Sequence, residues 1–206
     1  MLAGMTGHEK APIGRPRGFD IDEALERALL VFWERGYEGA SLADLTSAMG
    51  ITKTSMYAAF GNKEQLFRGA LRRYTEGPAS YGLRALEQAT AHAVATSLLN
   101  GAVQTTTRPE CPSGCLGVQG SLAAGDLGRP ARDALIEWRN DARLRLEERF
   151  RRAVEEGDLP HDTDAARLAR YLMTVAFGIA VQAASGLSRD DLQEVADTAL
   201  RAWPPA

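Results

Sequence analysis

Apolar residues recur every three or four positions along most of this chain, which is the spacing of residues on one face of an α-helix. No stretch alternates apolar and polar residues for long enough to form a convincing β-strand. The pattern therefore predicts an all-α fold. The expected helices are 21–37, two short helices that begin after Ser41 and Thr52, 63–76, 79–99, 113–124, 131–156, 163–185 and 188–203.

Gly77 and Pro78 interrupt the helical pattern and divide the chain into two groups of helices. We call residues 14–76 the head and residues 77–206 the body, and we expect residues 1–13 to be a flexible tail. A length of 206 residues is enough for one small and one medium domain with buried cores.

The head contains a stretch, residues 41–63, with the pattern of two short helices around a tight turn. Ser41 can cap the first helix, with Asp44 as its capping-box partner. Gly50 provides a permissive backbone for the turn, and Thr52 can cap the second helix. This pattern is typical of a helix-turn-helix, although an αα-hairpin that binds no DNA would show the same periodicity.

The second short helix has a small, polar outer face with a single cation. Such a face fits the major groove of DNA, where an α-helix can reach the edges of the bases. The face by itself is compatible both with DNA recognition and with a solvated hairpin. The residues of this outer face are Lys53, Thr54, Ser55, Tyr57 and Ala58.

With its flanks, this stretch resembles the tetracycline-repressor-like (TetR/AcrR) regulators. The resemblance covers residues 15–74, and its landmarks are the runs ITKTSMYAAFGNKEQLF and ALLVFWERGYEGASL. One departure is Thr46, where the family usually has alanine, but a small side chain is retained and the fold is not in doubt. The resemblance implies a three-helix helix-turn-helix DNA-binding domain followed by a helical domain for ligand binding and dimerisation.

The resemblance also assigns roles to residues of the head. Ser41, Thr52, Tyr57 and Lys63 match positions that hold DNA phosphates, whereas Lys53, Thr54, Ser55 and Ala58 match positions that face bases. The implied function is a homodimeric repressor that releases a palindromic operator in double-stranded DNA when a small-molecule effector binds the body. No cofactor is implied.

Charge is distributed unevenly along the chain, whose formal net charge is −3. Residues 1–75 hold 10 Lys and Arg against 9 Asp and Glu, whereas residues 76–206 hold 14 against 18. Local placement must therefore supply the attraction to phosphate. Arg15 and Arg17, just ahead of the first helix, are candidates for an arm on the DNA backbone or in the minor groove. A solvated arm without contact is the alternative.

Several features indicate the compartment. Residues 1–12 lack the apolar core of a signal peptide, and the longest apolar run, 171–187, is short for a bilayer span and contains polar residues. Two cysteines are too few for a disulfide scaffold. We therefore expect a cytoplasmic protein with no membrane partner.

The body is expected to hold an effector pocket and a dimer face. The helices 163–185 and 188–203 are rich in small and apolar residues, which suit an intermolecular four-helix bundle, although packing within one subunit is the alternative. The pocket candidates are aromatic, sulfur-containing or polar residues of the central helices, each of which could instead be ordinary core. These candidates are His92, Cys115, Gln119, Trp138, Tyr171, Met173 and Phe177.

Cys111 and Cys115 form a C-x-x-x-C at an expected helix start. A helix N-terminus can lower a thiol pKa, so a thiol-based redox- or electrophile-sensing regulator is the alternative function. Buried structural cysteines are the competing interpretation, and zinc is disfavoured because no histidine lies near the pair in sequence. An enzyme is not expected, because the chain has no catalytic sequence motif and only three scattered histidines.

Overall fold

The computed structural model describes residues 18–119 and 128–204, and every regular element in that part of the chain is helical. The predicted all-α fold is therefore confirmed. The predicted tail and the candidate arm residues Arg15 and Arg17 lie outside the described residues. The helices are α1 (Ile21–Gly39), α2 (Leu42–Met49), α3 (Lys53–Phe60), α4 (Lys63–Glu76), the 3-10 turn η1 (Pro78–Ser80), α5 (Tyr81–Leu86), α6 (Ala91–Thr106), α7 (Leu116–Gln119), α8 (Arg129–Glu155), α9 (Ala165–Ala184) and α10 (Arg189–Arg201).

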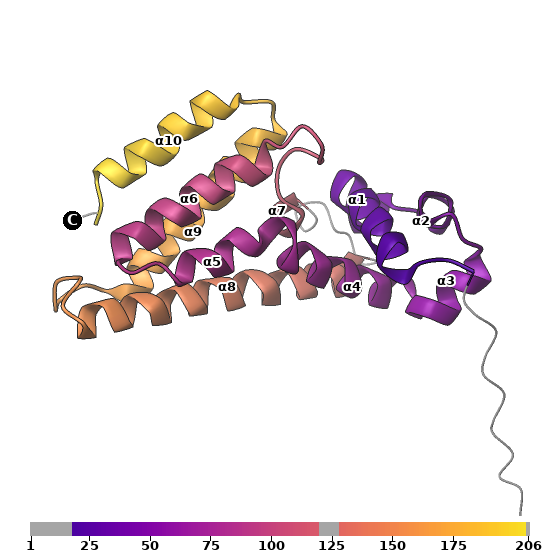
Figure 1. Ribbon diagram of the computed structural model, residues 1–206, viewed down its shortest axis with the longest axis horizontal. Coiled ribbons are helices and arrows are strands. Elements are labelled where there is room, and N and C mark those ends of the chain that lie inside the picture. The colour runs from indigo at the N-terminus through magenta and orange to yellow at the C-terminus, as the bar shows by residue number, and fades with distance from the viewer. Residues whose placement is uncertain (1–17, 120–127, 205–206) are drawn as a thin grey trace, which may run out of the picture.

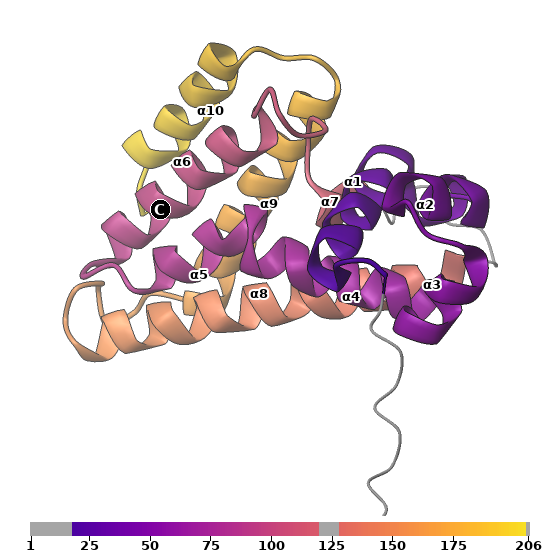
Figure 2. The ribbon, with the colours of Figure 1, turned by 45° about the vertical axis from the view of Figure 1, so that its right-hand side comes forward.

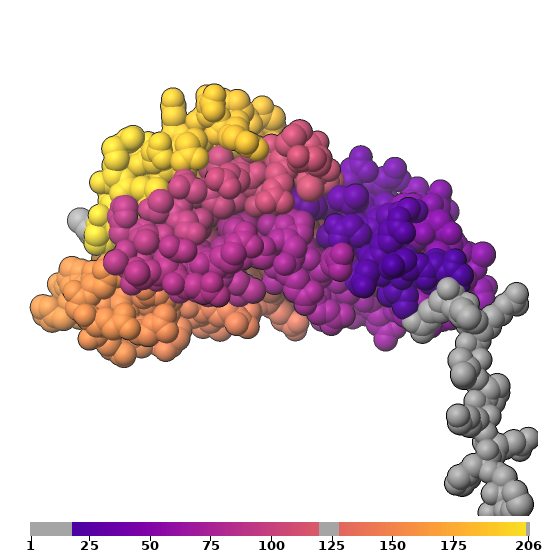
Figure 3. All heavy atoms as spheres, viewed as in Figure 1, coloured from indigo at the N-terminus to yellow at the C-terminus, as the bar shows by residue number. Residues whose placement is uncertain are grey.

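The molecule is elongated, with α1–α4 at one end and α5, α6, α9 and α10 at the other (Figure 1). Helix α8 runs along one side and reaches from the body to beneath α4 (Figures 1 and 2). The head and the body form one continuous surface on the face seen in Figure 3.

The helices of the head begin where the sequence supplies a capping side chain. The Asp20 carboxylate accepts hydrogen bonds from the backbone N–H groups of Asp22 and Glu23, at 2.8 and 3.0 Å. Thr52 caps α3 through a 3.1 Å bond from the Ser55 N–H. Each cap satisfies amide donors that have no partner within the helix, which fixes where the helix begins.

The expected helix 79–99 is wrong as a single element. The structure has η1 and α5, then a turn, and then α6, which Thr90 caps through a 3.1 Å bond from the Ala93 N–H. Two side chains, one from the turn after α8 and one from α8 itself, stabilise this break. The Asp158 carboxylate accepts from the Ala91 N–H at 2.5 Å, and Arg149 Nη2 donates to the carbonyls of Gln88 and Ala89 at 2.8 and 3.1 Å.

Two further boundaries differ from expectation. Helix α6 continues to Thr106 instead of ending near residue 99, and the Thr106 hydroxyl donates to the Ala102 carbonyl at 2.8 Å within the helix. The expected helix 113–124 is helical only over Leu116–Gln119 among the described residues, and residues 120–127 lie outside them.

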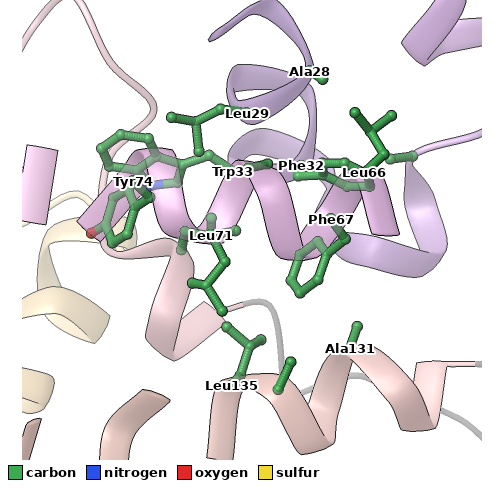
Figure 4. Packing of buried hydrophobic residues seen from close by; sticks show 14 of the residues in the cluster. Ala28, Leu29, Phe32, Trp33, Leu66, Phe67, Leu71, Tyr74, Ala131 and Leu135 are labelled. Atoms are coloured by element: carbon green, nitrogen blue, oxygen red, sulfur yellow. The ribbon is translucent and has the colours of Figure 1, made fainter. Parts of the chain in front are cut away.

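The core of the head is built from aromatic residues of α1 and α4. Phe32 and Phe67 pack edge to face with ring centroids 5.1 Å apart, and Trp33 and Tyr74 do so at 4.8 Å. Figure 4 shows Leu71 of α4 pointing toward Leu135 of α8. The same buried cluster includes residues of α7 and the first turns of α8. The hydrophobic core of the head is therefore continuous with part of the body and does not end at residue 76.

A second buried cluster joins α6, α8, α9 and α10 in the body. Its large members include Leu99, Leu146, Phe150 and Leu172, and the Trp203 ring lies 5.6 Å from that of Phe150. Together the two clusters fix α8 against both ends of the molecule. Among the described residues, no helix is long and apolar enough to cross a membrane.

Candidate nucleic-acid interface and internal cavity

The turn between α2 and α3 depends on Gly50. This residue adopts the left-handed conformation (φ 67°, ψ 29°), and its N–H donates to carbonyls at the end of α2. The turn brings Leu45 and Met49 of α2 together with Met56 of α3, and all three are buried in the core of the head. A side chain at position 50 would strain this conformation, so the turn that sets the angle between the two helices favours glycine.

The outer face of α3 presents most of the predicted base-facing residues to solvent. Lys53, Thr54 and Ala58 are exposed, and Tyr57 is 44% exposed. The Lys53 ammonium lies 5.9 Å from the centre of the Tyr57 ring. Ser55 differs from the prediction, because it is half-buried and its hydroxyl lies 3.0 Å from the Thr52 hydroxyl. The Ser55 hydroxyl is therefore hydrogen-bonded to the capping residue Thr52 and does not point freely outward from α3.

Ser41, one of the predicted phosphate contacts, is occupied by the cap of α2. Its N–H and hydroxyl both donate to Asp44, at 3.0 and 2.5 Å, while the Asp44 N–H donates back at 3.1 Å. Arg35 Nη1 lies 2.8 Å from the same carboxylate. Hydrogen bonds from Ser41, with a smaller contribution from Arg35, hold the pKa of Asp44 below its usual value. A phosphate at Ser41 would compete with the Asp44 carboxylate for the N–H and hydroxyl donors of Ser41.

Lys63 is the first residue of α4, and its side chain lies over the ring of Tyr37, which was not among the predicted site residues. Its ammonium is 4.5 Å from the centre of the Tyr37 ring, and burial lowers the pKa of Lys63. Tyr37 is fixed in turn against Phe32 and Phe67, with ring centroids at 6.2 and 5.3 Å. A cation over an aromatic face is held in place without losing its hydrogen-bond donors. The pair therefore presents an ammonium at a helix N-terminus, where anions bind.

Replacing Tyr37 with leucine is expected to weaken operator binding about fivefold, because about 1 kcal/mol of cation–π stabilisation is lost and Lys63 becomes free to move. If Lys63 then no longer contacts phosphate, the slope of log K against log salt should fall by about 0.9. Tyr37→Phe is the matched control, since it keeps the ring and should bind nearly as the parent does. Equal salt slopes for the leucine and phenylalanine variants would contradict this role of Tyr37.

An internal cavity of about 100 Å³ lies where α4, α5, α8 and α9 meet. Four of the predicted pocket residues line it: Cys115, Trp138, Met173 and Phe177. The other walls were not predicted, because most of them are apolar or small residues that no sequence pattern distinguishes from core, and Asp141 and Arg145 belong to the charge-rich surface of α8. These other walls are Thr75, Ala79, Tyr81, Gly82, Leu83, Leu86, Leu98, Asp141, Ala142, Arg145, Leu146, Ala176 and Ala180.

Three predicted pocket residues are not at this cavity. His92 is exposed on the outer side of α6, one residue after the buried Ala91. Tyr171 lines a shallow depression between α9 and α10, since it lies two positions, about 200° of helical rotation, before Met173. Gln119 lies in an open groove between α1 and residues 109–113. Helical rotation therefore separates residues whose similar chemistry had suggested a single pocket.

The cavity wall is hydrogen-bonded directly to α4, the last helix of the head. Trp138 Nε1 of α8 donates to the Thr75 hydroxyl at 2.8 Å, and the Thr75 hydroxyl donates to the Leu71 carbonyl at 2.8 Å. The neighbouring Tyr74 hydroxyl donates to Cys115 Sγ at 3.1 Å. Any movement of Trp138 or Cys115 would therefore disturb the hydrogen bonds that Thr75 and Tyr74 form at the C-terminal end of α4.

The two cysteines do not have the properties of activated thiols. Both are free, Cys115 is buried and Cys111 is half-buried, and burial raises the pKa of each thiol above its usual value. The hydrogen bond from Tyr74 opposes this effect at Cys115 without reversing it. In the described parts of the chain, no group of His, Cys, Asp or Glu side chains could hold a metal ion.

Both thiols are expected to react slowly with iodoacetamide at pH 7, because a raised pKa leaves a smaller thiolate fraction than in a free cysteine. The rate should increase as the pH rises above about 8.5, the pKa of an unperturbed thiol. Mass spectrometry of Cys111→Ser and Cys115→Ser would assign each adduct. Rapid alkylation of either cysteine below pH 7 would contradict the expectation.

The outer face of α9 and α10 carries exposed apolar side chains. Val181 of α9 is 40% exposed and Val195 of α10 is 46% exposed. Between the two helices lies the depression formed with Tyr171 and Val175. Most small and apolar residues of the two helices, such as Leu172, Ile179 and Leu192, are instead buried within the subunit, so only part of the expected apolar surface is exposed for a dimer contact.

Two family models match the two parts of the chain. The model described as "Bacterial regulatory proteins, tetR family" matches residues 24–70, and the model described as "Tetracyclin repressor-like, C-terminal domain" matches residues 96–202. The chain is 32% identical to the HTH-type transcriptional repressor ComR of Escherichia coli (strain K12), over 99% of this chain and 98% of ComR. It is 31% identical to the HTH-type transcriptional regulator YezE of Bacillus subtilis (strain 168), over 91% of this chain and 98% of YezE.

Solved structures that resemble this one are also TetR-family regulators. A cysteine mutant of the TetR family transcriptional regulator CifR, complexed with 26bp double-strand operator DNA, is 46% identical with a TM-score of 0.88, over 92% of this chain and 100% of that chain. A TetR transcriptional regulator from Rhodococcus sp. RHA1 is 40% identical with a TM-score of 0.62, over 89% and 98% of the two chains. This protein therefore belongs to the TetR family of bacterial transcriptional regulators.

Proposed function

We propose that the protein is a homodimeric transcriptional repressor that binds a palindromic operator and releases it when a small molecule occupies the cavity of the body. The proposal is supported mainly by the exposed face of α3, where Lys53, Thr54 and Ala58 are open to solvent. The turn at Gly50 sets the orientation of this helix. ComR is named as a repressor, and CifR is described in complex with operator DNA. A DNA-binding regulator of this kind would act in the cytoplasm.

Dimerisation through α9 and α10 would give two copies of α3 related by a two-fold axis. Two recognition helices that read adjacent major grooves must lie about 34–36 Å apart, which requires a palindromic site. The exposed apolar side chains of α9 and α10 support this face as the interface.

The cavity is connected structurally to the DNA-binding domain through α4. Thr75 of α4 forms part of its wall, and Trp138 is hydrogen-bonded to Thr75. An effector that moved Trp138 would favour a different position of α4 and hence of α3. Operator release is then a shift between two populations, in which the effector binds more tightly to the state with mis-spaced heads.

The test is binding of the purified protein to the DNA just upstream of its own reading frame, titrated across salt concentrations. Tight binding that requires both half-sites, with a steep decrease in affinity as salt rises, is expected of a dimer that contacts phosphates. Binding that is insensitive to salt, or unaffected when one half-site is scrambled, would refute the proposal. Mass spectrometry of the denatured protein would reveal an effector retained during purification.

The thiol-sensing alternative depends on Cys111 and Cys115. The raised pKa of both thiols argues against it. A Cys115→Ser variant that still releases the operator in response to its inducer would eliminate it.

A further inference from the structure

The cavity at the junction of α4, α5, α8 and α9 has walls of a single chemical character over most of its surface. Leu86, Leu98, Leu146, Met173 and Phe177 supply apolar side chains from four helices. Its volume of about 100 Å³ is well below the roughly 300–1,000 Å³ of sites for drug-sized ligands. A ligand that fits it must be compact and must bury mostly apolar surface.

The charged groups of the cavity wall neutralise each other. Arg145 Nε lies 2.7 Å from the Asp141 carboxylate, and their side chains are 55% and 62% exposed. The hydrogen bond to Asp141 and its charge raise the pKa of Arg145. The pair therefore stands at the solvent side of the cavity with no net charge. An ionised ligand would be desolvated without gaining a counter-charge.

The polar groups inside the cavity are mostly engaged already. The Thr75 hydroxyl donates to Leu71 and accepts from Trp138, and Cys115 Sγ accepts from Tyr74. Tyr81 is different. Within residues 18–119 and 128–204, no group forms a hydrogen bond with the Tyr81 hydroxyl, although burial raises its pKa and keeps it protonated. The cavity therefore offers an O–H donor that a ligand can use.

Two aromatic walls of the cavity are fixed by glycines on facing elements. A methyl group at Gly101 of α6 would lie 2.4 Å from Cδ2 of Tyr81, and one at Gly117 of α7 would lie 2.2 Å from Cζ3 of Trp138. Each ring therefore packs directly against backbone on the side of its glycine and cannot move further in that direction. Tyr81 and Trp138 therefore limit the size of a ligand on these two sides of the cavity.

We propose that the effector is a compact, uncharged and largely apolar molecule with one hydrogen-bond acceptor, which receives the Tyr81 hydroxyl. By comparison with a somewhat larger apolar cavity that holds benzene, its size is at most about six non-hydrogen atoms. This inference rests on the proposed function, in which the cavity is the effector site.

Four probes test the chemistry of the ligand. Cyclopentanone is uncharged and has one acceptor, and methylenecyclopentane has the same shape without the acceptor. Cyclopentanecarboxylate adds a charge, and benzophenone keeps the ketone but is much larger. Binding to the full-length protein would be followed by ligand-observed NMR and by the shift in Tm. We expect cyclopentanone to bind most tightly, methylenecyclopentane more weakly, and the other two not measurably.

Tyr81→Phe isolates the hydrogen bond. It should weaken cyclopentanone binding about three- to tenfold, the range of one hydrogen bond, and leave methylenecyclopentane binding unchanged. Tyr171→Phe is the matched control, because Tyr171 lies on α9 outside the cavity and its loss should alter neither. If Tyr81→Phe unfolds the protein, the four-probe ranking on the parent still decides the proposal.

The outcomes separate this inference from the proposed function. Preferential binding of the carboxylate or of benzophenone, no binding of any probe, or equal cyclopentanone binding by parent and Tyr81→Phe would overturn the proposed ligand class. A parent that binds no operator would instead overturn the proposed function, while the probe ranking would still describe the cavity. The Tyr81-dependent binding of cyclopentanone without any change in operator affinity would refute the effector role of the cavity.

Discussion

Replacing Phe67 with alanine is expected to lower the free energy of unfolding by about 3–5 kcal/mol, the range for removing a buried aromatic ring. Phe67 is fully buried, and its ring packs edge to face against Phe32 and Tyr37, at 5.1 and 5.3 Å. The substitution therefore removes apolar burial and two aromatic contacts and leaves a cavity beside Phe32 and Tyr37. Chemical denaturation followed by circular dichroism would measure the loss.

The effect should extend to DNA binding, because Phe67 joins α1 to α4 in the head. Operator affinity should fall at any temperature where the head is partly unfolded. Leu144→Ala is the control, since Leu144 of α8 is 52% exposed and its truncation should change stability by no more than about 0.5 kcal/mol. A Phe67→Ala loss as small as that of the control would mean that this core is not what holds the head together.

Replacing Lys53 with alanine is expected to weaken operator binding by about 1–3 kcal/mol, or roughly 5- to 150-fold, and to relax the preference for one base pair. Lys53 is the cation on the exposed face of α3, at its first position, where a lysine can reach guanine O6 and N7 in the major groove. A binding-site selection with parent and variant would identify the affected base pair.

The experiment also distinguishes base recognition from phosphate contact. If Lys53 contacts phosphate alone, affinity should fall uniformly across sequences and the salt slope should decrease by about 1. Arg152→Ala is the control for loss of one positive charge, because Arg152 lies on α8 in the body, where it pairs with Glu156. Unchanged affinity and unchanged base preference in Lys53→Ala would remove this residue from the interface.

The continuity of the core between head and body has a consequence for regulation. Leu71 and Tyr74 of α4 share one buried cluster with Leu116 of α7 and Leu135 of α8. Packed cores deform poorly, so a small shift of α8 at the cavity must either be absorbed locally or move α4. The Trp138–Thr75 hydrogen bond lies at this junction. In the proposed mechanism, this arrangement would transmit the effect of a small ligand to the DNA-binding surface at the far end of the molecule.

The sequence by itself determined the features that depend on local chemistry. Ser41, Gly50 and Thr52 specify caps and a turn through atoms within a few residues of each other, so the helix-turn-helix could be predicted from their spacing. The apolar period of three to four residues determined the helical class in the same way. The exposed face of α3 followed from that period except at Ser55, which is half-buried against the Thr52 cap.

Only the tertiary structure decided the features that depend on residues far apart in the chain. The break between α5 and α6 is stabilised by Asp158 and Arg149, which local propensity does not register. Tyr37 meets Lys63, and Trp138 meets Thr75, only after α1, α4 and α8 have packed. The cavity residues look like core because a cavity is space left among well-packed side chains. Its shape is set by how the helices meet, and no period along the sequence records it.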